Sequence, residues 1–192
     1  MEQTATSNHR HRALIYREPE DPFIVNSIGN CHASLGQWME ARAAYQRSAA
    51  GFQKAAGFRD TAGLSAGRGI AAALAQSNAA LALVQLGDVP GAIKELEYVS
   101  RRQGGFVDSR AALAALYYAD GRVEEAEKIW EYACDNISVG CSKYRDQEWV
   151  RKVRRWPPVM AQKLQSFVQL GSQADAPSDA APPKAVAAVT TS

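Results

Sequence analysis

Apolar and polar residues follow a helical period along most of this chain, and the pattern is clearest over residues 108–134. The first half of this stretch carries a broad apolar stripe that ends at Asp120 and Gly121, a pair suited to chain reversal. In the second half, apolar residues return at steps of three and four, with glutamate and lysine on the other face. The stretch therefore predicts two amphipathic helices joined by a tight turn.

The same unit recurs upstream. A shift of 34 residues places Gly121 on Gly87, and a further shift of 51 residues, which is 34 plus an insertion of 17, reaches Gly36. The insertion is rich in glycine, so it predicts a loop or a poorly ordered helix end; its glycines are Gly57, Gly63, Gly67 and Gly69. The Ala- and Leu-rich residues 70–86 that follow predict the most enclosed helix of the chain.

A helix-turn-helix period of 34 residues, with small residues where the helices cross, resembles the tetratricopeptide repeat (TPR) family. The positions that carry the resemblance are Ile28 with Gly29, Tyr117, the alanines Ala41, Ala92 and Ala126, and the large residues Tyr45, Leu96 and Trp130. The early tryptophan of the family pattern is replaced here, and no repeat ends in proline. The resemblance implies an all-α fold, a TPR-like α-solenoid of about three helix-turn-helix repeats with C-terminal capping helices.

The sequence divides into three parts. Residues 1–20 are polar and predict a flexible segment, residues 21–171 form the solenoid with its capping helices, and residues 172–192 are an Ala/Pro-rich tail expected to be disordered. In the capping region, Trp149 and Trp156 mark one face of a predicted helix, and a last helix is expected to end at Gly171. The predicted solenoid begins too early in this sequence to leave room for a full transit peptide, so if the protein is imported, we expect that peptide to be missing from it.

Composition narrows the classes of function. The net charge is +2 over 192 residues, and the short basic clusters, including residues 151–155, are not interleaved with aromatic residues, so nucleic-acid binding is not expected. Those clusters are interpreted as solvated helix ends. No apolar run approaches the ~20 residues that cross a bilayer. We therefore expect a protein or peptide partner and no membrane span.

The sequence lacks the motifs of common enzymes and cofactor sites. It contains no nucleophile elbow, no HExxH and no dinucleotide fingerprint, and its three histidines predict no metal site. We expect no catalytic residue, no cofactor and no small-molecule substrate. Cys134 and Cys141 are separated by a segment that can turn back, so they form either a disulfide or two ordinary thiols.

Residues 26–170 also resemble a narrower group, the chloroplast TPR proteins of plants and green algae, through the AALAALYY and GRVEEAEKIW helices, the two spaced cysteines and VRRWPP. This resemblance implies a chloroplast location at the thylakoid, either peripheral or in the lumen; without it the expectation is cytoplasmic. It also implies a non-enzymatic scaffold for protein–protein interaction, an assembly or maintenance factor for photosynthetic complexes.

In TPR arrays the first helix of each repeat lines a concave groove that binds a partner segment. The register places the following candidate partner-binding residues in this groove: Phe23, Asn26, Asn30, Leu74, Asn78, Leu81, Asp108 and Tyr118. No lysine or arginine is among them, so the groove is predicted to prefer an apolar or neutral segment. The alternative is that these residues face no partner and pack against the chain's own second helix or terminal segments.

The alternative function is a co-chaperone for acidic chaperone tails. Asn30 and Asn78 match the clamp asparagines of that subfamily, but the positions that hold its basic residues do not match.

Overall fold

The computed structural model describes residues 20–57, 65–135 and 141–174. Within these ranges the regular structure is entirely helical, without a β-strand, and the helices pack in adjacent pairs. The predicted all-α class is therefore confirmed. The segments predicted to be flexible or disordered lie outside the described residues, apart from their inner margins.

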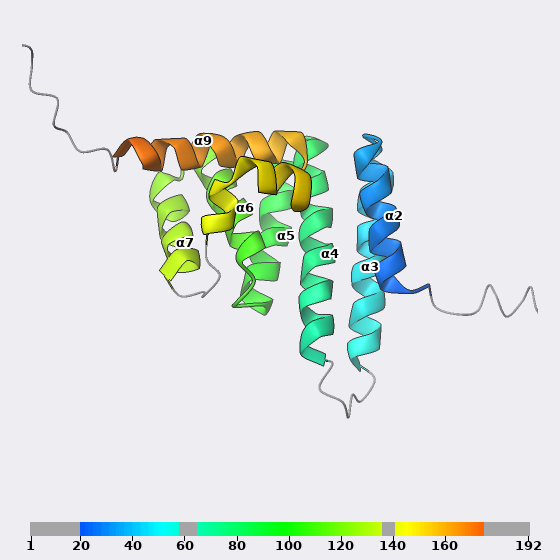
Figure 1. Cartoon of the computed structure of the whole chain (residues 1–192). Coiled ribbons are helices and arrows are strands. Elements are labelled where there is room, and N and C mark those ends of the chain that lie inside the picture. The colour runs from blue at the N-terminus through cyan, green and yellow to red at the C-terminus, as the bar shows by residue number, and fades with distance from the viewer. Residues whose placement is uncertain (1–19, 58–64, 136–140, 175–192) are drawn as a thin grey trace, which may run out of the picture.

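Three helical pairs stand side by side in chain order (Figure 1). They are α2 (Pro22–Ser34) with α3 (Trp38–Gly57), α4 (Ser65–Gln85) with α5 (Val89–Arg102), and α6 (Val107–Ala119) with α7 (Val123–Asp135). The turn inside each pair carries a glycine with positive φ, at Gly36, Gly87 and Gly121. Glycine reaches this left-handed conformation without the cost of a Cβ, so the same residue type reverses the chain three times.

The middle pair begins earlier than predicted. Helix α4 starts at Ser65, so the last residues of the glycine-rich insertion, including Gly67 and Gly69, are helical. The rest of the insertion, residues 58–64, lies outside the described residues. The most enclosed helix is α6 instead of α4: all its residues from 108 to 117 are buried, because α5, α7 and α9 surround it.

The C-terminal part differs from a simple pair of capping helices. A short helix α8 (Ser142–Arg145) and a five-residue π-helix η1 (Trp149–Val153) replace the single helix expected around Trp149. Arg155 then adopts a positive φ of 58°, which turns the chain into α9. Helix α9 (Pro158–Ala174) crosses the other helices and packs against α6 and α4 (Figure 1), and it continues past Gly171.

Two clusters of buried side chains hold these elements together. The larger cluster contains residues from every element between α4 and α9, and it includes Leu96, Leu116 and Leu164. The smaller cluster, Ala41, Tyr45 and Ala79, connects the first pair to α4. Within the first pair, Gly29 of α2 permits the close approach to α3, since a Cβ at that position would lie 2.6 Å from the Tyr45 ring. Close helix crossing thus depends on small residues at the positions that the repeat pattern identified.

Candidate binding surfaces

Asp108, the second residue of α6, is the centre of a buried polar network. Its carboxylate accepts two hydrogen bonds of 2.7 Å from Arg154, one from Nε to Oδ1 and one from Nη2 to Oδ2. It also accepts hydrogen bonds from the Tyr144 hydroxyl at 3.0 Å, the Trp156 indole at 3.1 Å and the Ser77 hydroxyl. The side chain of Asp108 is 3% exposed and that of Arg154 is 13% exposed, so the ion pair is shielded from water.

Arg154 extends the network to the second repeat. Its Nη1 donates to Asn78 Oδ1 at 2.8 Å, and the Asn78 amide nitrogen is 3.4 Å from Asn26 Oδ1. These bonds link residues of α2, α4 and α6 to a side chain from the C-terminal segment. Because Arg155 reverses the backbone, Arg154 and Trp156 can both point at Asp108.

The electrostatics of this network follow from burial and from charge. Burial alone would raise the pKa of Asp108, but the charge of Arg154 and the hydrogen bonds from Arg154, Ser77 and Trp156 lower it below its ordinary value. Burial raises the pKa of Tyr144, and the adjacent Asp108 carboxylate raises it further. Tyr144 is therefore a hydrogen-bond donor at neutral pH. The charge of the Asp108 carboxylate is balanced by that of the Arg154 guanidinium.

The predicted groove is occupied by the chain itself over the second and third helical pairs. Leu81, Asn78 and Asp108 are buried, and the half-buried Tyr118 contacts the ring of Phe167 in α9 with centroids 5.7 Å apart. The expectation that Asp108 faces a partner without a cation is wrong, because Arg154 supplies that cation. The alternative packing, against a terminal segment, is what the structure shows for these residues.

The remaining predicted residues lie toward the first repeat. Asn26, Asn30 and Leu74 are half-buried, and Asn30 accepts a hydrogen bond from the Tyr45 hydroxyl at 2.9 Å. Phe23 is 63% exposed, although its ring packs edge-on against Phe52. The structure therefore does not bring the eight predicted residues together on one open surface.

An exposed apolar row runs along the outer side of α2. Ile24 is 61% exposed and Ile28 is 40% exposed, and Leu35 and Met39, at the turn into α3, are each 71% exposed. Cys31 lies between them as an exposed free thiol. We call these five residues the α2 face. The sequence alone did not indicate this face, because Ile28 was interpreted only as a position of the repeat pattern.

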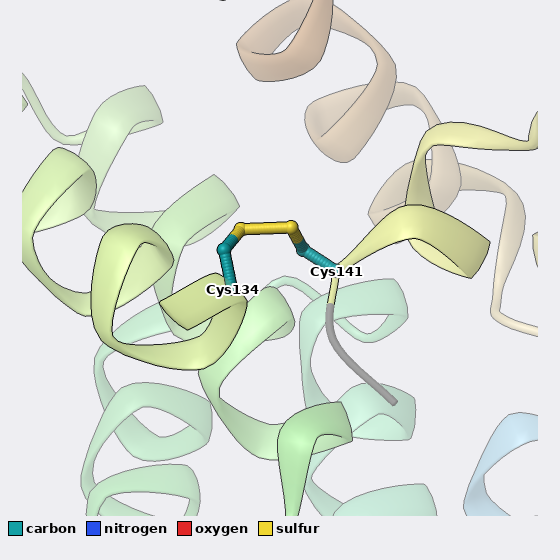
Figure 2. Close-up of a disulfide and its surroundings, with 2 residues drawn as sticks. All are labelled: Cys134 and Cys141. Carbon is teal, nitrogen blue, oxygen red and sulfur yellow. A yellow bond between two sulfur atoms is a disulfide. The ribbon is translucent and has the colours of Figure 1, made fainter. Parts of the chain in front are cut away.

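A disulfide joins Cys134 at the end of α7 to Cys141 just before α8 (Figure 2). Of the two arrangements that the sequence left open, the structure has the bridge. It anchors the beginning of the segment that carries Tyr144, Arg154 and Trp156. The residues between the two cysteines lie outside the described part of the chain.

The sequence contained one indication of the Asp108 network. Asp108 is a carboxylate at an inner-face position of a helix whose later residues, from Ala111 to Ala119, are apolar or aromatic, and a buried carboxylate requires a cationic partner. Arg154 was instead assigned to a solvated basic cluster, which is wrong for this residue, although Arg151 in the same cluster is exposed. Tyr144 and Trp156 were missed as members of the network because helical periodicity does not identify contacts between distant segments.

The described residues contain neither a cluster that could hold a metal ion nor a helix that could cross a membrane. No group of three or more His, Cys, Asp or Glu side chains in this part of the chain is arranged to hold a metal ion. In the same residues, no helix has both the length and the apolar character for a bilayer span.

Comparisons with protein-family models, with curated proteins and with solved structures found no match.

Proposed function

We propose that this chain is a non-enzymatic protein-binding scaffold with a TPR-like α-solenoid, and that it assists the assembly or maintenance of thylakoid complexes in chloroplasts. The solenoid is supported by the paired helices and by turn glycines at Gly87 and Gly121, one 34-residue period apart. The location rests on the resemblance to chloroplast TPR proteins. The disulfide supports an oxidising compartment, such as the thylakoid lumen.

The observation that carries the binding role is the α2 face. A terminal repeat in a solenoid normally presents a polar outer side, because no neighbouring repeat covers it. Here the outer side of the first described helix is apolar, with Ile24 and the C-cap residue Leu35 more than half exposed, and Met39 at the start of α3 continues it. Since the inner face is filled by the chain's own C-terminal segment, the α2 face is the better candidate for the partner.

The chemistry of α2 identifies the kind of partner segment. Helix α2 contains no Asp, Glu, Lys or Arg, so it offers no charge to attract an acidic or a basic ligand. Ile24, Ile28, Cys31 and Leu35 follow one another at steps of four, three and four, the spacing of a seam between two packed helices. The proposed occupant is therefore an amphipathic helix of a partner protein, bound through its apolar side.

A charge placed in the seam tests this role. We expect Ile28→Glu to abolish the partner capture that wild-type protein achieves in thylakoid extract, because a carboxylate would be desolvated against an apolar helix. Gln162→Glu is the matched control, since Gln162 is exposed on α9, away from α2. Both variants must keep the wild-type circular dichroism and melting temperature. Equal capture by Ile28→Glu and the control would overturn the proposal.

The alternative function, capture of acidic chaperone tails in the groove, has less support. Its two asparagines are engaged within the chain, Asn30 with Tyr45 and Asn78 with Arg154. The cation nearest to them, Arg154, is already paired with Asp108. An acidic tail peptide whose binding is abolished by Asn30→Ala, with the fold intact, would favour this alternative over the α2 face.

A further inference from the structure

Among the described residues, Arg110 is a buried cation without a carboxylate partner. The residue is 9% exposed and lies in α6, two positions after Asp108. Its guanidinium donates only long hydrogen bonds to two backbone carbonyls, at 3.4 Å to Phe106 and 3.3 Å to Ser100. It also lies over the ring of Tyr132, 4.8 Å from the centroid. A guanidinium has more N–H donors than these two bonds use.

This arrangement contrasts with the other shielded arginines of the described residues. Arg154 is paired with Asp108, and Arg42 makes a bidentate pair with Glu95. Arg110 has only carbonyl dipoles and an aromatic ring, and its burial lowers its pKa. Buried charges in proteins are normally paired, since desolvation is costly without an opposite charge. The surroundings of Arg110 are therefore incomplete without an anion.

The space for such an anion is a cavity between α5, α6 and α7 that is open to solvent. Its volume is about 630 Å³, and its lining includes Arg110, Arg101, Lys128, Ile129, Tyr132 and Glu125. Glu125 does not neutralise the cations of the cavity, because Arg122 holds both its oxygens at 2.6–2.7 Å. Arg101 approaches its own partner, Glu97, only to 3.4 Å. The cavity therefore has an excess of positive charge.

The cavity also has an apolar side. Ile129 is half-buried and Tyr132 is 46% exposed, so a ligand held by Arg110 would lie beside apolar surface. Residues two apart on a helix point in nearly opposite directions, about 200° apart. Arg110 is thus directed away from Asp108, and the C-terminal segment that fills the groove does not occupy this cavity.

We propose that this cavity binds a carboxylate that is attached to an apolar group, as presented by a partner protein at a C-terminal apolar residue. The planar guanidinium of Arg110 matches the two oxygens of a carboxylate, and Lys128 adds long-range attraction. Ile129 and Tyr132 cover the apolar side chain. The site is independent of the α2 face and of the assignment to thylakoids.

N-acetyl-L-leucine, which has one carboxylate and one apolar side chain, is a suitable probe, and its neutral amide is the matched control. Both are titrated at constant ionic strength while the Arg110 Nε–Hε correlation and the Tyr132 ring signals are followed by NMR. We expect saturable shifts with the acid and at least about tenfold weaker binding of the amide, because only the acid can pair with the guanidinium.

Arg110→Met, which keeps the apolar stem, should lose the acid-dependent shifts at Tyr132. Arg47→Gln removes an exposed cation on α3 and should leave them unchanged. The comparison of acid and amide in the wild-type protein decides the matter even if Arg110→Met does not fold. Equal binding of acid and amide, or shifts that appear away from the cavity, would overturn the proposal. Tighter binding of inorganic phosphate than of the acid would overturn the carboxylate assignment.

Discussion

At the scale of single residues, Asp108 and Arg154 determine how the segment between α8 and α9 packs against α6. They are 46 positions apart in sequence and form two parallel hydrogen bonds in the interior. The desolvation of such a pair offsets much of its attraction, so the pair adds little net stability relative to apolar residues. Its role is selective: only a C-terminal segment that brings a cation to this position can fill the groove without leaving a buried charge.

Asp108→Asn should therefore destabilise the protein strongly. The asparagine is nearly isosteric, but it leaves the Arg154 guanidinium buried without an opposite charge, which costs about 3–5 kcal/mol. The free energy of unfolding from urea denaturation at pH 7 measures the loss. Asp120→Asn, at an exposed carboxylate just after the opposite, C-terminal end of α6, should change it by less than about 0.5 kcal/mol. A loss below about 1 kcal/mol in Asp108→Asn would contradict the buried pair.

The pH dependence of stability should contain a contribution from the same carboxylate. The folded state lowers the pKa of Asp108, so its contribution is fully present above the unfolded pKa of about 4 and is lost as the pH falls through the lower folded value. A carboxyl-detected NMR titration should find Asp108 still ionised at a pH of about 4, where the carboxyl of an aspartate in an unfolded peptide is half protonated. Protonation of Asp108 at or above that pH in the folded protein would contradict this prediction.

At the scale of helices, the sequence predicted the features that depend on residues close together in the chain, namely turns, helix pairs and helix starts. The three turn glycines, the helical pairs and the start of α5, where Asp88 caps the Gly91 amide, follow from spacing and from residue type. The position of α9 across α4 and α6 could not be predicted in this way. It depends on contacts between segments far apart in sequence, such as the bond from the Val159 amide to Gln85, which periodicity does not encode.

The same limit explains the outcome for the candidate site. The sequence identified Asn78, Leu81 and Asp108 as inner-face residues, and they do face inward. It did not reveal that Arg154 and Trp156 fill that face, because a basic cluster beside a Pro-Pro break is equally compatible with an exposed cap. The α2 face was missed for the opposite reason, since an apolar row at helical spacing is more often buried.

Helix α9 should contribute to stability mainly through its apolar side. Leu164 is fully buried against the large core cluster, so Leu164→Ala should lower the free energy of unfolding by about 2–5 kcal/mol. Gln162→Ala is the control, because Gln162 is exposed on the same helix. Chemical denaturation of both variants measures the difference. Similar stability of the two variants would mean that α9 does not dock on α6.

The disulfide should stabilise the attachment of the segment after α7. It closes a loop with a sequence separation of 7, for which the loss of chain entropy in the unfolded state predicts about 2–3 kcal/mol. Cys134→Ser should lower the melting temperature, and a reductant should have the same effect on the wild-type protein. Mass spectrometry after alkylation without reductant should label only Cys31. Labelling of all three cysteines in protein from its native compartment would contradict the bridge and weaken the lumenal assignment.

At the scale of the whole molecule, the two halves differ in how they are held. Helices α4 to α9 share the large core cluster, and the polar network joins the C-terminal segment to α4 and α6. The first pair is attached by the extensive packing of α3 against α4, which contains the small cluster, and by Arg42, which donates hydrogen bonds to the Ala79 carbonyl and to Glu95 in α5. The α2 face has no partner within the described chain, so α2 is held from one side only.

Native-state hydrogen exchange should reveal this asymmetry. Amides of α2 should exchange at least about tenfold faster than those of α6, because α2 can open without disrupting the large core, whereas α6 is buried from residue 108 to residue 117 and opens only with global unfolding. Binding of a partner helix on the α2 face should slow exchange in α2 and leave α6 nearly unchanged. Equal protection of the two helices in the free protein would contradict the separation into two cores, and protection that appears only in α6 on partner binding would place the interface in the groove.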